Sequence, residues 1–352
     1  MHSAVDLKVL RLDSRQLVSQ AMQGKVTELP VYFWLADPEL EARVGDIVGV
    51  RCWFKRLEFL ERGGPFRRGS ETRREWCDRL QPNEYDWPTV DELMSEMDEV
   101  VAATLKVDES KSFQLEVLGP TEYSEYSCSS GKTPEAMKLN QVTHQFDFSV
   151  LTILDPRKAD MIHRRFFDLL FEVARRATEY DGIDSIRIAD DFCTYAGSIY
   201  RPDFTDAILG RQVELGKAIT KGGKYSVLHS DGDLRKHLLP LAKAYSGFHP
   251  LDIGSKSTVA DAHEWATALK AVRALLPDTV FFTGIPVDLL CSSHVSADGL
   301  VEVVRHVAES VGRERLVLTT THRPYPGWSF QDFEEKARAI KRFTRAVAMQ
   351  TT

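Results

Sequence analysis

The 352-residue sequence lacks an apolar run long enough to cross a bilayer, since no window approaches the ~18 apolar residues of a membrane span. Its first residues, MHSAVDLKVLRLDS, also lack the apolar core of a signal peptide. An excess of basic residues is missing too: 45 Lys and Arg are outnumbered by 52 Asp and Glu, giving a net charge of −7. This balance argues against binding to nucleic acid or to an anionic membrane. We therefore expect a cytoplasmic protein with neither kind of partner.

Cysteine is scarce, and the chain has no C-x-x-C pair. An odd number of scattered cysteines excludes a disulfide framework and fits free thiols in a reducing cytoplasm. Internal repeats, low-complexity tracts and linkers that would divide domains are also absent. With 43% hydrophobic and 28% charged residues, values usual for globular proteins, the sequence predicts a single domain over residues 1–352. The five cysteines are Cys52, Cys77, Cys128, Cys193 and Cys291.

The second half of the chain alternates short apolar runs with amphipathic stretches, at a spacing of roughly 25–40 residues. This pattern predicts βα units around a parallel sheet and, by their number, an α/β fold with a single (β/α)8 TIM-type barrel. We expect a helical extension over residues 1–29, an excursion over the barrel mouth at 55–90 and a loop over 121–133. The strands are expected to end near Leu35, Leu118, Ala189, Leu228, Leu251, Thr283 and Thr321, with one more between 46 and 106.

The stretch KYSVLHSDGD (residues 224–233) is the most informative part of the chain. A short apolar strand ends here, directly before an amphipathic segment. Residues two apart in an extended strand point the same way, so His229 and Asp231 place an imidazole beside a carboxylate. Parallel α/β proteins keep their chemistry at this end of the strands. The alternative is an ordinary turn, in which Asp231 or Asp233 caps the next helix and His229 is satisfied in the core.

Other strand ends add polar residues to the same mouth. His322 follows the last strand, and together with His229 and Asp231 it completes a set that suits Zn²⁺, or Fe²⁺ as the alternative. Many of the aspartates will be simple helix caps or solvated loop residues. The remaining strand-end candidates are Trp34, Asp37, Glu116, Asp190, Asp191, Asp252 and Asp288.

Five stretches of the second half resemble the uroporphyrinogen decarboxylase superfamily, in the order in which that family has them. They are GIDSIRIADDFCTYAGSIYRPDF (182–204), KYSVLHSDGDL (224–234), GFHPLDI (247–253), FTGIPVDLL (282–290) and LVLTTTHRPYPGWSFQDFEEKARAI (316–340). The resemblance implies a (β/α)8 barrel. Members of this superfamily are metal-free porphyrinogen decarboxylases or zinc methyltransferases that pass a methyl group to a corrinoid protein.

The chain departs from both branches. True uroporphyrinogen decarboxylases carry several arginines after the first strand, where this chain has FWLADPELEAR with Arg43 alone. A porphyrinogen is therefore not the expected substrate. The methyltransferases hold zinc with a His-x-Cys pair and a third ligand, usually Cys, after the last strand. By this resemblance His229 matches the histidine, Asp231 takes the first cysteine position, and His322 falls at or beside the second. Cys291 is not the first choice as a ligand.

The leading hypothesis is a metal-dependent methyltransferase or demethylase acting on a small methylated substrate, such as an aromatic ether. His229, Asp231 and His322 would bind Zn²⁺ or Fe²⁺, while Asp190 or Asp191 would act as general acid or orient the substrate, and a separate corrinoid protein would accept the methyl group. A second hypothesis is a carboxy-lyase with no cofactor, in which His322 handles protons. A third is a barrel that only binds a ligand, and a homodimer is left open. The expected aromatic pocket consists of Tyr32, Trp34, Tyr123, Tyr126, Tyr195 and Trp328.

Overall fold

The computed structural model describes residues 12–25, 28–58, 64–68, 71–129, 146–324 and 329–348. Eight parallel strands form the barrel sheet: the first strand pairs with the last, and from the second strand onward each pairs with the next in the chain. The ring is completed between the first two strands, where the Asp46 amide donates to the Val31 carbonyl at 2.7 Å. The (β/α)8 prediction is confirmed. The strands are β1 (Val31–Tyr32), β2 (Ile47–Cys52), β3 (Ser112–Leu118), β4 (Ser185–Ala189), β7 (Tyr225–His229), β8 (Gly247–His249), β9 (Val280–Ile285) and β10 (Leu316–Thr320).

The two faces of the strands bury different residues. The interior of the barrel is filled largely by apolar side chains from β1, β2, β7, β9 and β10, which form a cluster separate from the larger core under the helices. On β3 and β4 the interior is charged instead, because Glu116 and Arg187 form an ion pair with both side chains 1% exposed. Burial lowers the pKa of Arg187 to about 10, so the guanidinium stays charged at neutral pH.

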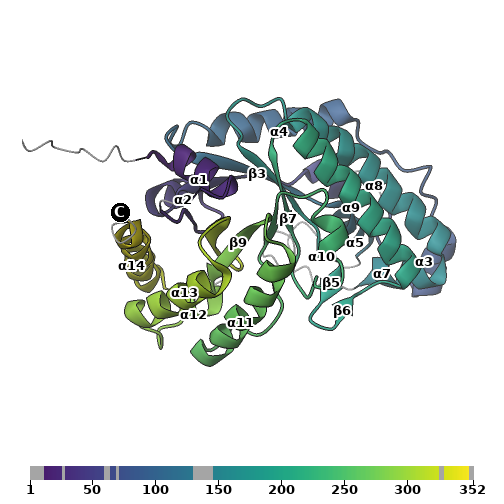
Figure 1. The fold of residues 1–352 in the computed structure, drawn as a ribbon. Helices are drawn as coiled ribbons and strands as arrows, with labels where there is room; N and C mark the ends of the chain where they lie inside the picture. The colour runs from purple at the N-terminus through teal and green to yellow at the C-terminus, as the bar shows by residue number, and fades with distance from the viewer. Residues whose placement is uncertain are drawn as a thin grey trace, which may run out of the picture.

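Helices cover the outside of the barrel (Figure 1). Their starts are marked in the sequence by capping residues: Thr89, Asp155, Thr258 and Ser296 each accept a hydrogen bond from the first helical turn. The longer helices that flank the strands are α4 (Val90–Thr104), α8 (Pro156–Ala177), α9 (Pro202–Lys221), α11 (Val259–Leu275), α13 (Ala297–Val311) and α14 (Phe330–Ala348). Shorter ones are α2 (Pro38–Val44), α5 (Pro120–Cys128), α7 (Asp147–Leu154), α10 (Leu238–Leu241) and α12 (Val287–Cys291).

Within the expected N-terminal extension, the described part forms α1 (Ser14–Met22). Its buried face, including Val18 and Met22, joins the interior cluster of the barrel rather than the outer core. Arg15 fixes the helix by pairing with Asp184, just before β4, at 2.8 Å. The helix therefore packs against the amino-terminal end of the barrel, opposite the ends at which chemistry was expected.

Several local predictions are wrong; the first strand, for example, ends at Tyr32 instead of near Leu35. Residues 120–128 form α5 instead of a loop, because Pro120 occupies the first helical position and Gly119 precedes it in an extended conformation. The sixth strand in the barrel, β8, ends at His249 instead of near Leu251. Pro250 has no N–H with which to continue the ladder, and Leu251 adopts a φ of +62°, outside the extended region.

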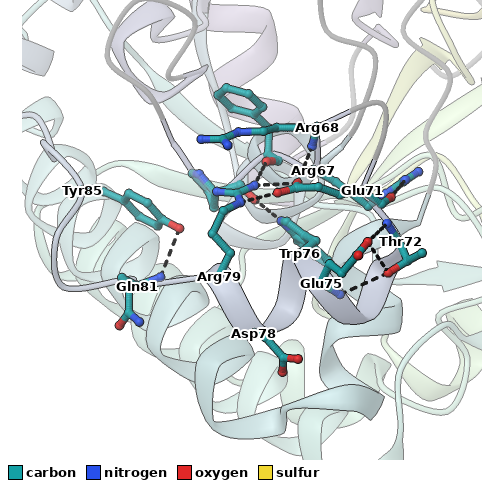
Figure 2. Close-up of polar contacts among 12 residues, drawn as sticks. Arg67, Arg68, Glu71, Thr72, Glu75, Trp76, Asp78, Arg79, Gln81 and Tyr85 are labelled. Atoms are coloured by element: carbon teal, nitrogen blue, oxygen red, sulfur yellow. Dashed lines mark hydrogen bonds and ion pairs between the residues drawn. The ribbon is translucent and has the colours of Figure 1, made fainter.

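The segment after β2 contains the short helices η1 (Lys55–Glu58) and α3 (Arg73–Arg79). Figure 2 shows how α3 is fixed: Thr72 and Glu75 form a capping box, and Glu71 binds the guanidinium of Arg79. The Trp76 indole donates to the Pro65 carbonyl at 2.7 Å. The helix packs on α7, and Lys158 of α8 donates to the Cys77 carbonyl at 2.7 Å.

Between β4 and α9 the chain forms a small antiparallel hairpin of β5 (Cys193–Thr194) and β6 (Gly197–Ser198). Among the helices of the described ranges, none combines the length and the apolar character that crossing a membrane requires.

Glu125 of α5 generates a prediction about the pH dependence of stability. Its Oε1 atom accepts hydrogen bonds from Tyr200 (2.9 Å) and from the Ser149 amide (3.0 Å), but burial raises the pKa of the carboxyl to about 7. A pKa raised on folding means that stability falls as the pH rises from about 4.5 to 7. Glu125→Gln should remove this decrease in the free energy of unfolding, which amounts to up to about 3 kcal/mol. Chemical denaturation at pH 5 and pH 8 provides the measurement.

Glu309→Gln, at an exposed position on α13, is the matched control and should keep the wild-type pH dependence. A Glu125→Gln variant whose stability changes with pH as the wild type does would contradict the assignment.

Candidate metal centre

The carboxyl ends of β4 and β7 bring three metal-ligating side chains together. Ala189 of β4 pairs in register with His229 of β7, so the residues two positions beyond each strand partner, Asp191 and Asp231, come side by side. One ligand atom each from Asp191, His229 and Asp231 can be chosen so that all lie within 4.8 Å of one another. His229 Nε2 is 3.8 Å from Asp231 Oδ1. These separations are of the size that a single bound cation can bridge.

The two carboxylates of this cluster repel each other. Burial, followed by the charge of Asp231, raises the pKa of Asp191 well above its ordinary value. Burial also raises the pKa of Asp231, although His322, Lys256 and Arg187 oppose the shift. A hydrogen bond holds the pair in place, because the Asp231 amide donates to Asp191 Oδ1 at 2.7 Å. A cation between them would relieve the repulsion and favour both ionised forms.

His322 approaches the same carboxylate from the end of β10. Its Nε2 atom is 4.0 Å from Asp231 Oδ2, and its Nδ1 atom is 2.8 Å from the Arg323 carbonyl. A carbonyl can only accept, so Nδ1 carries a proton, and Nε2 is the ring nitrogen that faces Asp231. His322 thus borders the cluster through Asp231, whereas the ligand atoms that all lie within 4.8 Å of one another belong to Asp191, His229 and Asp231.

Trp34 packs at the centre of the histidines. Its ring centroid lies 5.1 Å from that of His229, 5.6 Å from His249 and 5.5 Å from His322, each in an edge-on arrangement. The Arg187 guanidinium lies over the indole at 4.3 Å. The indole Nε1–H is buried and has no hydrogen-bond partner among the described residues. An oxygen atom next to it, from water or from a substrate, would satisfy this donor.

Asp190 points away from this cluster. The strand alternation that brings Asp191 to the mouth sends Asp190 into the helical shell. There its carboxylate accepts hydrogen bonds from Thr121 (2.8 Å), from the Glu122 amide (2.8 Å) and from the Gln212 side chain (2.5 Å). Burial raises its pKa to about 7. Asp190 therefore joins the start of α5 to α9, and we assign it a structural role in place of the catalytic one expected.

The expected aromatic pocket is only partly assembled. Tyr123 is 1% exposed in the shell, where its hydroxyl accepts from the Phe54 amide at 2.8 Å, and Tyr195 is 67% exposed on the β5–β6 hairpin. Tyr32 is buried inside the barrel below Trp34, and Tyr126 is half-buried on α5. Trp328 lies outside the described residues. Of the expected aromatic residues that the structure describes, Trp34 is the one with ring contacts to His229 and His322.

Three residues near the cluster were not among the predicted site residues. His249 lies against His229 because the two are paired in register between β7 and β8, and their Nδ1 atoms are 2.6 Å apart. Arg187 was hidden inside an apolar strand, and Lys256 follows β8 in an irregular loop. Lys256 forms a buried ion pair with Asp252, and burial lowers the pKa of its ammonium group. The stretch GFHPLDI contains His249 at the end of β8, but a strand that continued to Leu251 would place this histidine inside the strand and not at its end.

The donor set fits a divalent cation. Two imidazole nitrogens with one or two carboxylates suit Zn²⁺, Fe²⁺ or Mn²⁺, whereas a soft thiolate site would have needed cysteine. Cys291 does not supply such a thiolate: it lies in α12, where burial raises its pKa to about 11 and keeps the thiol protonated at neutral pH.

No protein-family model and no curated protein matches the chain. Two solved structures are similar in part. A B12-independent methionine synthase from Shewanella sp. W3-18-1 matches over 76% of this chain and 69% of its own, at 11% identity and a TM-score of 0.29. A family 26 endo-β-1,4-mannanase from Cellulomonas fimi matches over 92% and 74%, at 11% identity and a TM-score of 0.46. Both TM-scores are too low for either likeness to indicate an activity.

Proposed function

We propose that this chain is a metal-dependent enzyme that moves a methyl group from an oxygen of a small methylated substrate to a separate acceptor. The observation that carries the proposal is the meeting of His229, Asp231 and Asp191, with His322 beside them, at the carboxyl ends of the strands. The resemblance to the uroporphyrinogen decarboxylase superfamily supports methyl transfer as the reaction. A corrinoid carried on another protein is the acceptor that this resemblance favours.

The protein's own residues have three tasks in this proposal. His229 and His322 offer imidazole nitrogens, and Asp231 and Asp191 offer carboxylate oxygens, so that together they would hold a divalent cation. A cation held in this way would supply a Lewis acid to an oxygen atom of the substrate. Trp34 forms an apolar wall against the histidine rings and limits the entry of water on that side.

The chemical character of the donors bears on the substrate. Nitrogen and oxygen ligands leave a cation more Lewis acidic than thiolates do, which suits an ether or ester oxygen better than a thiol. In the reaction the bond between the methyl carbon and this oxygen breaks, a bond from the methyl carbon to the acceptor forms, and the departing oxygen takes up a proton. The buried Trp34 N–H provides a donor for a substrate oxygen in the same region.

A carboxy-lyase is the second candidate, and one observation favours it. Two buried cations, Arg187 and Lys256, lie close enough to Asp231 to oppose the rise in its pKa that burial causes. The same positive charges would attract the carboxylate of an acid substrate to the mouth. Removal of the metal by a chelator separates the two candidates. Methyl transfer from an ether to reduced cobalamin, monitored by the absorbance of methylcobalamin, should stop when the chelator is added. A decarboxylation that continues after metal removal would favour the lyase.

The metal ligands can be tested separately from any substrate. We expect the purified protein to contain close to one divalent metal ion per chain. His229→Ala and His322→Ala should each weaken metal affinity by at least about 100-fold, because each removes an imidazole donor. Residues that only hydrogen-bond to a ligand usually change the affinity by about 10–100-fold. Elemental analysis and titration against a competing chelator provide the measurement. His294→Ala, at an exposed position, should bind metal as the wild type does. Full metal content in either test variant would mean that the ligands are wrongly assigned.

Asp190 and Asp191 form a matched pair of adjacent positions with different expected effects. Asp190→Ala leaves three buried donors without their acceptor and should lower the free energy of unfolding by about 3 kcal/mol, with little change in metal affinity. Asp191→Ala should weaken metal binding and cost less stability, because it also removes a repulsion with Asp231. Chemical denaturation and metal titration of both variants test this. An Asp190→Ala variant that folds stably but loses metal would reverse the assignment.

A further inference from the structure

We propose that His249 is a positioning residue that fixes the tautomer of His229 and so directs the lone pair of His229 Nε2 toward the candidate metal centre. The inference rests on the metal centre of the proposed function and adds a residue that lies outside the ligand set. His249 is 1% exposed at the end of β8, and its ring packs against that of His229 at a centroid distance of 4.8 Å.

The direction of the hydrogen bonds follows from a fixed acceptor at one end of the chain. His249 Nε2 lies 2.9 Å from the Thr320 carbonyl oxygen, which can only accept. His249 Nε2 therefore carries the proton, and in a neutral imidazole the other nitrogen, Nδ1, is then an acceptor. His229 Nδ1 lies 2.6 Å from this acceptor, so it must donate. The remaining nitrogen of His229, Nε2, is left with a lone pair, 3.8 Å from Asp231 Oδ1.

The opposite arrangement is unfavourable at both contacts. A proton on His249 Nδ1 would leave its Nε2 lone pair facing the carbonyl of Thr320 at 2.9 Å, and two acceptors would repel each other. Protonating both nitrogens of either ring would place a second buried positive charge near the Arg187 guanidinium, which lies over the Trp34 indole that contacts both rings. With both rings neutral, the relay from His229 through His249 to Thr320 is the one arrangement that gives each of these two contacts a donor and an acceptor.

Packing holds the two rings in the relay. Trp34 contacts both imidazoles edge-on, and the register of β7 and β8 fixes the backbone beneath them. Without the His249 acceptor, the Nδ1–H of His229 would be buried with no partner at this contact. His229 could then turn its ring or shift its proton to Nε2, and either change would remove the lone pair from the mouth.

Two substitutions separate the hydrogen bond from the packing. His249→Asn places an amide oxygen near the position of Nδ1 and keeps an acceptor for His229, although it loses the bond to Thr320. His249→Phe keeps a flat ring but offers no acceptor. Co²⁺ serves as the probe, because its visible absorption reports both binding and ligand geometry. We expect His249→Phe to bind Co²⁺ about 10–100-fold more weakly with an altered spectrum, and His249→Asn to stay within about threefold of the wild type.

His263→Phe, on the exposed face of α11, is the matched control and should leave Co²⁺ binding unchanged. Wild-type affinity and spectrum in His249→Phe would overturn the inference while leaving the metal centre intact, and so would equal losses in His249→Asn and His249→Phe. Failure of the wild-type protein to bind Co²⁺ would contradict the metal centre itself and the inference with it.

A measurement on the metal-free wild-type protein covers the case in which a variant does not fold. Correlation of ring protons with ring nitrogens by NMR distinguishes protonated from unprotonated imidazole nitrogens. The inference requires protonated Nδ1 and unprotonated Nε2 in His229, and the reverse in His249. The opposite tautomer in either ring would overturn it.

Discussion

Side chains along each strand of this barrel alternate between the interior and the helical shell, and the other features of the mouth depend on this alternation. It continues for two residues past the strand ends, so the register between β4 and β7 brings Asp191 to Asp231, and the register between β7 and β8 brings His229 to His249. A shift of one residue sends a neighbouring aspartate, Asp190, into a different set of contacts under α5 and α9.

The electrostatics of the mouth favour a bound cation. The carboxylates of Asp191 and Asp231 are close together at a buried place that disfavours their charge. Burial also disfavours the protonated form of His229. Neutral histidine and ionised aspartate are the forms that a divalent metal requires. The interior of the barrel contributes the ion pair of Glu116 and Arg187, whose guanidinium lies directly against Trp34. The apolar wall of the mouth is thus supported from below by a buried charge.

Strand parity and the alternation of elements were sufficient to predict the barrel and the pairing of His229 with Asp231. They could not separate Asp190 from Asp191, because β4 is buried on both faces and its sequence does not show which face points into the barrel. His249 does not stand out in the sequence, because the apolar run continues past it to Leu251, although Pro250 ends β8 at His249. Tyr123 faces the shell instead of the pocket because residues 120–128 form a helix and not a loop. His322 lies beyond its strand, where its contact with the Arg323 carbonyl, and not parity, sets its orientation.

The most direct test of the metal centre is X-ray diffraction from crystals soaked with Mn²⁺ or Zn²⁺, with data collected on both sides of the absorption edge of the metal. We expect an anomalous peak between the side chains of Asp191, His229, Asp231 and His322. If crystals soaked at a saturating metal concentration show no peak at this mouth, its assignment as a metal centre is contradicted. A peak that appears only elsewhere, such as at the surface pair His263 and His306, would contradict it too.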